Sequence, residues 1–156
     1  MPRHGETRIL PYPADLMYAV VADVEKYPEF LPGCHALKVL SRTPMPKGEL
    51  LRAEMRVGFK TFTGSYVSRV VLNSAERRID VVQERGPFRR LENRWRFAPA
   101  GAGTKVDFFI AFEFRNLLLN AAAAAAFEPA VHKLSAAFEA RAKVMKAIRS
   151  ESPPTP

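Results

Sequence analysis

The middle of the chain alternates between apolar and polar residues with a period of two. From Leu51 to Val57 every second residue is apolar, and the residues between them are charged. This pattern is typical of a β-strand that buries one face and exposes the other. Turn-forming stretches interrupt this alternation, as at Pro44, Pro46 and Gly48 and again at "GAGT". We therefore predict six consecutive antiparallel strands, over residues 34–43, 49–59, 60–73, 77–84, 89–99 and 105–114.

Helical spacing replaces this alternation near both ends of the chain. A short strand over Thr7–Leu10 is followed by Pro13 and a predicted helix over Ala14–Asp23, because proline and an acidic residue suit a first helical turn. The residue before a proline avoids the α region, so Tyr27-Pro28 is expected to end this helix, and Glu29–Leu31 to form one further short turn.

The C-terminal part is rich in alanine, which favours helix. Phe127, Val131, Leu134 and Phe138 recur at helical spacing and predict one long C-terminal helix. Pro129 is expected to start or kink its main body.

This order of elements predicts an α+β fold. A curved antiparallel sheet of about six to seven strands would wrap around the long C-terminal helix, with short helices after the first strand. Each strand has one apolar face that must be covered, and the last helix is the long element available. We expect a single domain over residues 1–149, a disordered tail over 150–156, and an apolar cavity between the bent sheet and the helix.

Charge and composition add two expectations, one about binding partners and one about cellular location. The 156-residue chain carries a net charge of +8, which favours anionic partners such as phospholipid head groups or RNA without distinguishing them. The first ten residues are charged where a secretory signal would be apolar, and the longest apolar run, residues 117–127, is too short to span a bilayer. We expect a cytoplasmic protein, at most peripheral to the inner membrane, that does not bind DNA.

The predicted strands contain few candidates for catalytic or metal-binding residues. Cys34 and His35 are neighbours in a strand and point to opposite faces, and the three histidines share no metal-binding spacing. The acidic residues of the alternating segments fall on the polar face, so we expect no catalytic residues, no metal and no cofactor. Four polar residues fall on the apolar face, where they could bond a ligand carbonyl or a buried water: Tyr66, Ser68, Gln83 and Asn93.

Four stretches, in this order and spacing, resemble a known family: "VADVEKYPEFLPGC", "SRV" after "GSY", "GPFRRLENRWRF" and "FEARAKVM". They are similar to the coenzyme Q-binding START-domain family, which is grouped with polyketide cyclase and dehydrase-like proteins and includes bacterial ribosome-association toxins of the RatA type. The resemblance covers residues 3 to 146. It implies a helix-grip fold (START/Bet v 1-like) and binding of a polyprenylated quinone such as ubiquinone in a hydrophobic tunnel, in support of respiratory electron transport.

Two groups of residues are candidates for the site. Residues of the apolar faces and of the stretch 20–34, where prolines would stiffen an apolar rim, are expected to line the cavity: Val20, Phe30, Leu31, Met55, Phe62, Tyr66, Phe88, Trp95, Phe108, Phe112, Phe127, Leu134 and Phe138. Phe88 is also expected to form an exposed tip, ringed by Arg85, Arg89 and Arg90, that contacts a membrane or RNA.

Three functions remain open from the sequence. The first is a non-catalytic carrier of a polyprenyl quinone or another lipid. The second is a ribosome-binding regulator whose basic surface contacts the large subunit. The third is an enzyme of the polyketide cyclase or dehydratase type, which would depend on Tyr66 or Asn93.

Overall fold

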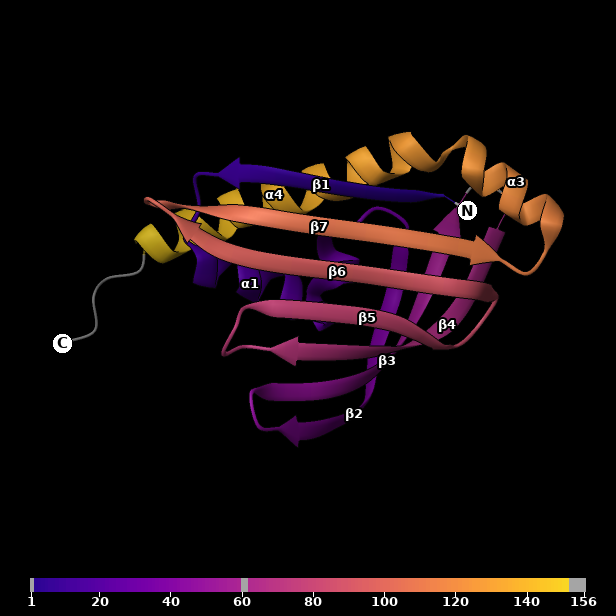
Figure 1. Ribbon diagram of the computed structural model, residues 1–156, viewed down its shortest axis with the longest axis horizontal. Coiled ribbons are helices and arrows are strands. Elements are labelled where there is room, and N and C mark those ends of the chain that lie inside the picture. The colour runs from indigo at the N-terminus through magenta and orange to yellow at the C-terminus, as the bar shows by residue number, and fades with distance from the viewer. Residues whose placement is uncertain (1, 60–61, 152–156) are drawn as a thin grey trace.

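A seven-stranded antiparallel sheet forms the body of the protein in a computed structural model (Figure 1). The structure describes residues 2–59 and 62–151, without the side chains of Phe59, Phe62, Ser150 and Glu151. The strand order is β1-β7-β6-β5-β4-β3-β2, so β1 and β2 are the edge strands. The strands are β1 Arg3–Leu10, β2 Cys34–Met45, β3 Gly48–Phe59, β4 Phe62–Asn73, β5 Arg78–Arg85, β6 Phe88–Ala100 and β7 Gly103–Phe114.

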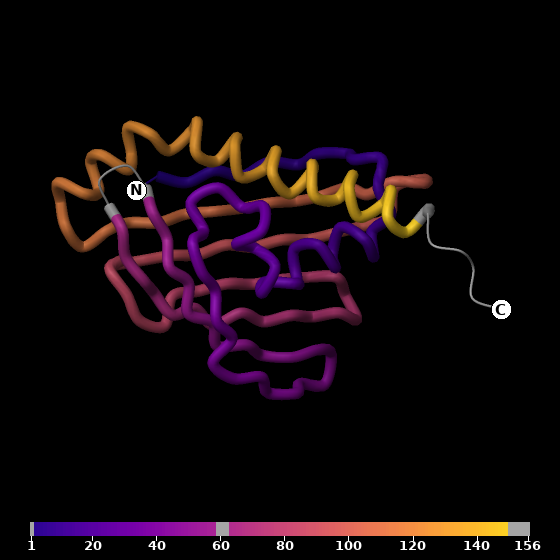
Figure 2. The backbone as a smooth tube through the Cα atoms, turned by 180° about the vertical axis from the view of Figure 1, so that it is seen from behind, coloured from indigo at the N-terminus to yellow at the C-terminus, as the bar shows by residue number. Residues whose placement is uncertain are grey.

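The helices cover the concave side of this sheet. They are α1 Ala14–Ala22, the 3-10 turn η1 Val24–Lys26, α2 Tyr27–Phe30, α3 Leu117–Ala125 and α4 Phe127–Glu151. The strands β2, β3 and β4 bend sharply, and α4 runs along the sheet with the α1–α2 segment beside it (Figures 1 and 2). The predicted α+β architecture, a curved sheet gripping a long C-terminal helix, is confirmed.

The first helix ends where the sequence predicts, but not because of Pro28. Asp23 leaves the helical conformation, with φ −81° and ψ 70°. The chain then re-enters helix, and Tyr27 lies in the α region with φ −53° and ψ −40°. Pro28 falls in the first turn of α2, where the amide hydrogen that proline lacks has no helical partner to lose. The prediction that Tyr27-Pro28 ends the first helix, with Tyr27 outside the α region, was therefore wrong.

Strand β1 begins four residues earlier than predicted. Its register pairs Glu6 with Phe108 and Arg8 with Val106, so the charged side chains share a face with the buried residues of β7. The sequence gives no sign of this, because alternation reveals a buried face only when that face is apolar.

Pro129 divides the C-terminal helix as expected. Its ring would clash with the carbonyl of the residue four positions earlier, Ala125, where α3 ends. The second helix, α4, then starts at Phe127 and continues to Glu151, two residues past the predicted end of the domain. Residues 152–156 lie outside the described residues.

Candidate ligand-binding site

The concave face of the sheet collects the apolar residues of six strands. Its register aligns Leu37, Met55 and Tyr66 across β2, β3 and β4. Ile79, Trp95 and Phe108 align in the same way across β5, β6 and β7. Opposite residues of antiparallel strands point to the same face, so the predicted inward positions form one continuous surface.

The structure brings together the described residues that were predicted to line a cavity, in two adjoining clusters. The main cluster joins the α1–α2 segment, the sheet and α4, and contains Val20, Leu31, Trp95, Phe108, Phe127 and Phe138 buried, with Phe30, Met55, Phe112 and Leu134 partly buried. The second contains buried Phe88 with partly buried Tyr66 and Phe112. Phe112 connects them, since its ring lies 5.3 Å from that of Phe127. The side chain of Phe62 lies outside the described residues.

The two ends of this surface differ in how tightly they pack. Around Trp95, the rings of Phe108 and Phe138 lie 4.4 and 5.1 Å away. The cavity beside Trp95 and Phe138 measures about 10 Å³, room for one water molecule. At this end the predicted lining residues are therefore packed core.

Accessible apolar surface remains further along the concave face. Met55, Tyr66, Phe112 and Leu134 face the interior yet are only half-buried. These four predicted lining residues therefore keep part of their apolar surface accessible.

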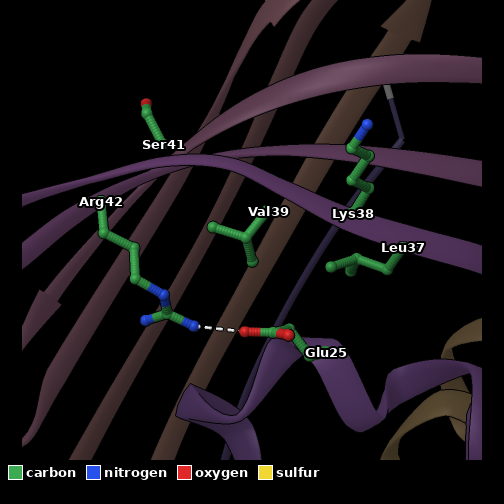
Figure 3. A pocket seen from close by; sticks show the side chains of 6 residues that line it. All are labelled: Glu25, Leu37, Lys38, Val39, Ser41 and Arg42. Carbon is green, nitrogen blue, oxygen red and sulfur yellow. Dashed lines mark hydrogen bonds and ion pairs between the residues drawn. The ribbon is translucent and has the colours of Figure 1, made fainter.

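A groove of about 510 Å³ opens between η1 and the edge strand β2 (Figure 3). Leu37 and Val39 supply apolar surface, and the Arg42 guanidinium donates a 2.5 Å hydrogen bond to the Glu25 carboxylate. Arg42 also bonds Glu49 at 2.8 Å. The groove therefore joins apolar side chains of the concave face to the protein surface beside the α1–α2 segment.

The predicted apolar rim points inward. The ring of Phe30 packs edge-to-face on Tyr27 and Phe138, at 5.9 and 5.5 Å. The Tyr27 hydroxyl donates to the carbonyl of Val21, which fixes α2 against α1. Phe30 and Tyr27 anchor this segment to the core and do not form a projecting tip.

The predicted aromatic tip at Phe88, ringed by arginines, also differs from expectation. Phe88 is 7% exposed and stacks on Phe114 at 4.5 Å, so the prediction of an exposed aromatic tip was wrong. A bulge between Phe88 and Arg90 shifts the register and turns the ring inward. Arg85, Arg89 and Arg90 are exposed, as a surface contact requires.

The sequence analysis missed the exposed apolar pair beside these arginines. Leu117 and Leu118, in the first turn of α3, are 79% and 85% exposed. Arg115 precedes them, and its guanidinium donates to the carbonyl of Gly86 at 3.1 Å. This contact places α3 next to the β5–β6 hairpin, so leucines and arginines share one end of the molecule.

A cluster of polar side chains that the sequence analysis also missed joins β1 to α4. Ser135 donates to Glu6 at 2.7 Å, and Arg8 donates to Ser135 at 3.2 Å and to Glu139 at 2.7 Å. Burial alone would raise the pKa of Glu6, but hydrogen bonds from Ser135 and His4 and the charge of Arg8 lower it below its ordinary value. Because these groups satisfy one another, the cluster holds the helix on the sheet, and we call it the β1–α4 latch.

Cys34 is buried, and burial raises the pKa of its thiol to about 11. It therefore stays a thiol near neutral pH, which is unsuited to nucleophilic chemistry. Within the described residues no group of three or more His, Cys, Asp or Glu is placed to hold a metal ion. None of the described helices combines the length and apolar character needed to cross a bilayer.

Comparison with known proteins identifies the fold. A sequence profile of the family "Polyketide cyclase / dehydrase and lipid transport" matches residues 10–139. The chain belongs to this family. A START superfamily protein from Mycobacterium smegmatis superposes with a TM-score of 0.78 at 19% identity, over 92% of this chain and 98% of that one. The START-type fold expected from the sequence is thus confirmed.

Two relatives carry names that bear on function. The chain is 34% identical over 140 residues to the ribosome association toxin RatA of Rickettsia prowazekii, covering 88% of this chain and 93% of the relative. It is 35% identical over 143 residues to the coenzyme Q-binding protein COQ10 homolog B, mitochondrial, of Xenopus laevis, covering 89% of this chain and 57% of the relative. The relatives thus include both a coenzyme Q-binding protein and a RatA toxin, the two kinds of protein that the resemblance places in one family.

Proposed function

We propose that this protein is a non-catalytic carrier of a hydrophobic ligand, namely a polyprenylated quinone such as ubiquinone, in support of respiratory electron transport. The observation that carries the proposal is the accessible apolar stretch of the concave face, at Met55, Tyr66, Phe112 and Leu134. The relative named as a coenzyme Q-binding protein supports the choice of quinone.

An isoprenoid tail suits this surface. It offers no hydrogen bonds, so its binding depends on dispersion and on removal of apolar area from water. Each buried isoprene unit contributes roughly 1.5–3 kcal/mol, by analogy with a buried aliphatic side chain. The neutral side chains Met55, Phe112 and Leu134 provide such an environment.

The end of the molecule at α3 supports delivery from a membrane. Exposed Leu117 and Leu118 lie beside Arg115, and the β5–β6 hairpin adds Arg85 and Arg89. Leucines that enter the interface and arginines that attract anionic head groups together favour peripheral binding to an anionic bilayer.

The direct test is to extract the protein, purified without detergent, with organic solvent and to search the extract for quinone by mass spectrometry. We expect bound quinone in the wild type and in Ala136→Asp, whose substituted position is exposed on α4. Leu134→Asp, which places a charge in the accessible apolar stretch, should lose it. Wild-type protein that is empty and also fails to take up added ubiquinone would contradict the proposal.

A second candidate function is regulation of the ribosome through the large subunit. The RatA relatives and the net charge of +8 favour it. Binding to ribosomal RNA should weaken steeply with salt, because bound cationic side chains release counterions. Sedimentation of the protein with large ribosomal subunits at low and at moderate salt tests this, and absence of co-sedimentation in both would remove it.

A further inference from the structure

The polar side chains on the concave face of β4, β5 and β6 are not equivalent. The Gln83 amide donates to the Phe88 carbonyl at 2.7 Å and accepts from the Phe88 amide at 3.0 Å. Asn93 accepts from the Trp95 indole and donates to the Phe109 carbonyl, both at 2.9 Å. Each of these two amides therefore already donates one hydrogen bond and accepts another within the protein, so neither is an unpaired buried group.

The side chain of Ser68, in contrast, is not hydrogen-bonded to the described part of the protein. It is 4% exposed, and its Oγ atom has no hydrogen-bond partner among the described residues. Its neighbours across the strands are Ala53, which has no polar side chain, and Gln83, which is occupied. A hydroxyl buried without a partner destabilises a fold, so its presence in an apolar surface calls for a group that bonds it.

Tyr66 is the second available hydroxyl. It lies two residues before Ser68 on the same face of β4, about 7 Å away along the strand. Within the described residues its hydroxyl donates to the Met55 sulfur at 3.6 Å, which is a weak acceptor. The ring packs edge-to-face on Phe88 at 5.3 Å, which fixes its direction. Burial, with Cys34 nearby, raises the pKa of Tyr66, so this hydroxyl keeps its proton and remains a donor.

We propose that Ser68 and Tyr66 form a polar anchor that donates hydrogen bonds to the carbonyl oxygen of a lipid bound on the concave face. The anchor deepens the proposed function and rests on it. Both groups are neutral donors, so they suit a neutral carbonyl, such as that of a quinone head group, better than a carboxylate or a phosphate, which would need a compensating charge. The lipid tail then lies along Met55, Phe112 and Leu134.

The anchor is tested by calorimetric titration with two probes that share one tail. Ubiquinone-2 has two ring carbonyls and a geranyl tail, whereas geranylbenzene has the tail and a ring without carbonyls. Ser68→Ala and Tyr66→Phe should each weaken ubiquinone-2 binding by about 3–10-fold, the loss expected for one hydrogen bond. Their affinity for geranylbenzene should stay unchanged.

Matched controls separate binding from folding. Ser65→Ala alters an exposed serine of the same strand, and Tyr18→Phe removes another half-buried tyrosine hydroxyl. Both controls should bind ubiquinone-2 as the wild type does. Ligand-free Ser68→Ala should keep or raise its thermal midpoint, because the change removes an unpaired buried hydroxyl.

The outcomes distinguish the two proposals. If the wild type binds both probes and the two anchor variants bind ubiquinone-2 with wild-type affinity, the anchor is wrong and the carrier function stands. Equal losses for both probes, or a lowered midpoint of ligand-free Ser68→Ala, would also overturn the anchor, because they indicate a packing role. If the wild type binds neither probe, the carrier function fails and the anchor with it.

Discussion

Gly86 shows how a residue without a side chain lets its neighbours pack closely. A Cβ atom at this position would lie 2.5 Å from the Cβ atom of Tyr66 and 2.6 Å from Oε1 of Gln83. The close approach of the backbone keeps Tyr66 against Phe88 and lets Gln83 reach the Phe88 backbone. A glycine is therefore required beneath the proposed anchor.

Gly86→Ala should lower the free energy of unfolding by about 1–3 kcal/mol, because the added methyl overpacks this contact. Urea denaturation followed by circular dichroism measures the change. Gly5→Ala is the matched control, since its Cβ atom would meet Phe109 at an ordinary 3.8 Å, and it should leave stability nearly unchanged. Equal effects of the two substitutions would show that the contact at Gly86 is unimportant.

At the residue scale, the sequence predicted which face of the sheet a side chain lies on better than it predicted how far that side chain is buried. Alternation placed Trp95, Phe108 and Phe112 on the concave face, and the strand register confirms this. It did not predict that Phe88 is buried, because the bulge beside it interrupts the period of two. Neither Ser68 nor Tyr66 could be separated from Asn93 and Gln83, because hydrogen-bond partners depend on strand pairing.

At the scale of elements, the prolines explain both a success and an error. A proline ring inside a helix clashes with the carbonyl four residues earlier, which is why Pro129 correctly predicts an interruption near the boundary between α3 and α4. The same residue type is accepted in a first turn, which is why Pro28 lies inside α2. The β1–α4 latch was missed for a different reason. In the sequence, charged residues on the inward face of a strand cannot be distinguished from charged residues of a solvent-exposed strand.

The latch should make a pH-dependent contribution to stability. Arg8→Ala should lower the free energy of unfolding by about 1 kcal/mol at neutral pH, as expected for a half-buried ion pair with hydrogen bonds. The pKa of Glu6 is lowered in the folded protein from 4.5, so its stabilisation is present above about pH 4.5 and is lost as the pH falls below that value. The difference between wild type and variant should therefore shrink in acid.

Urea denaturation at neutral pH and below pH 4.5 measures this difference. Arg3→Ala, at an exposed position of the same strand, is the control and should have little effect at either pH. A loss for Arg8→Ala that is independent of pH would contradict the role of the charges.

At the scale of the whole molecule, the charge of +8 matters through its distribution. Several arginines are paired with acidic residues on the sheet, as Arg52 is with Glu84 and Arg96 with Asp80. Arg85 and Arg115 lie instead at the end of the molecule that carries the exposed leucines of α3, together with Arg89, which is 4.0 Å from the Glu113 carboxylate. Composition predicted an anionic partner, but only the fold brings residues 85–89 and 115–118 to one end.

Replacing Leu117 and Leu118 together by serine should weaken binding to vesicles that contain phosphatidylglycerol by about tenfold, because two apolar side chains no longer enter the interface. Co-sedimentation with vesicles measures this, and wild-type binding should fall as salt is added. Met45→Ser changes an exposed apolar residue of the β2–β3 hairpin, away from α3 (Figure 1), and should bind normally. Unchanged binding of the double variant would place the membrane contact elsewhere.

The free edge of β2 has a consequence for how the protein behaves when crowded on a surface. Two irregularities, between Cys34 and Ala36 and between Val39 and Ser41, interrupt its pairing, and Pro44 removes a donor near its end. An edge broken in this way is a poor template for a strand from another molecule. If the proposed membrane binding concentrates copies on one patch of bilayer, this edge protects them from joining sheet to sheet into insoluble aggregates, even though the strand is twelve residues long.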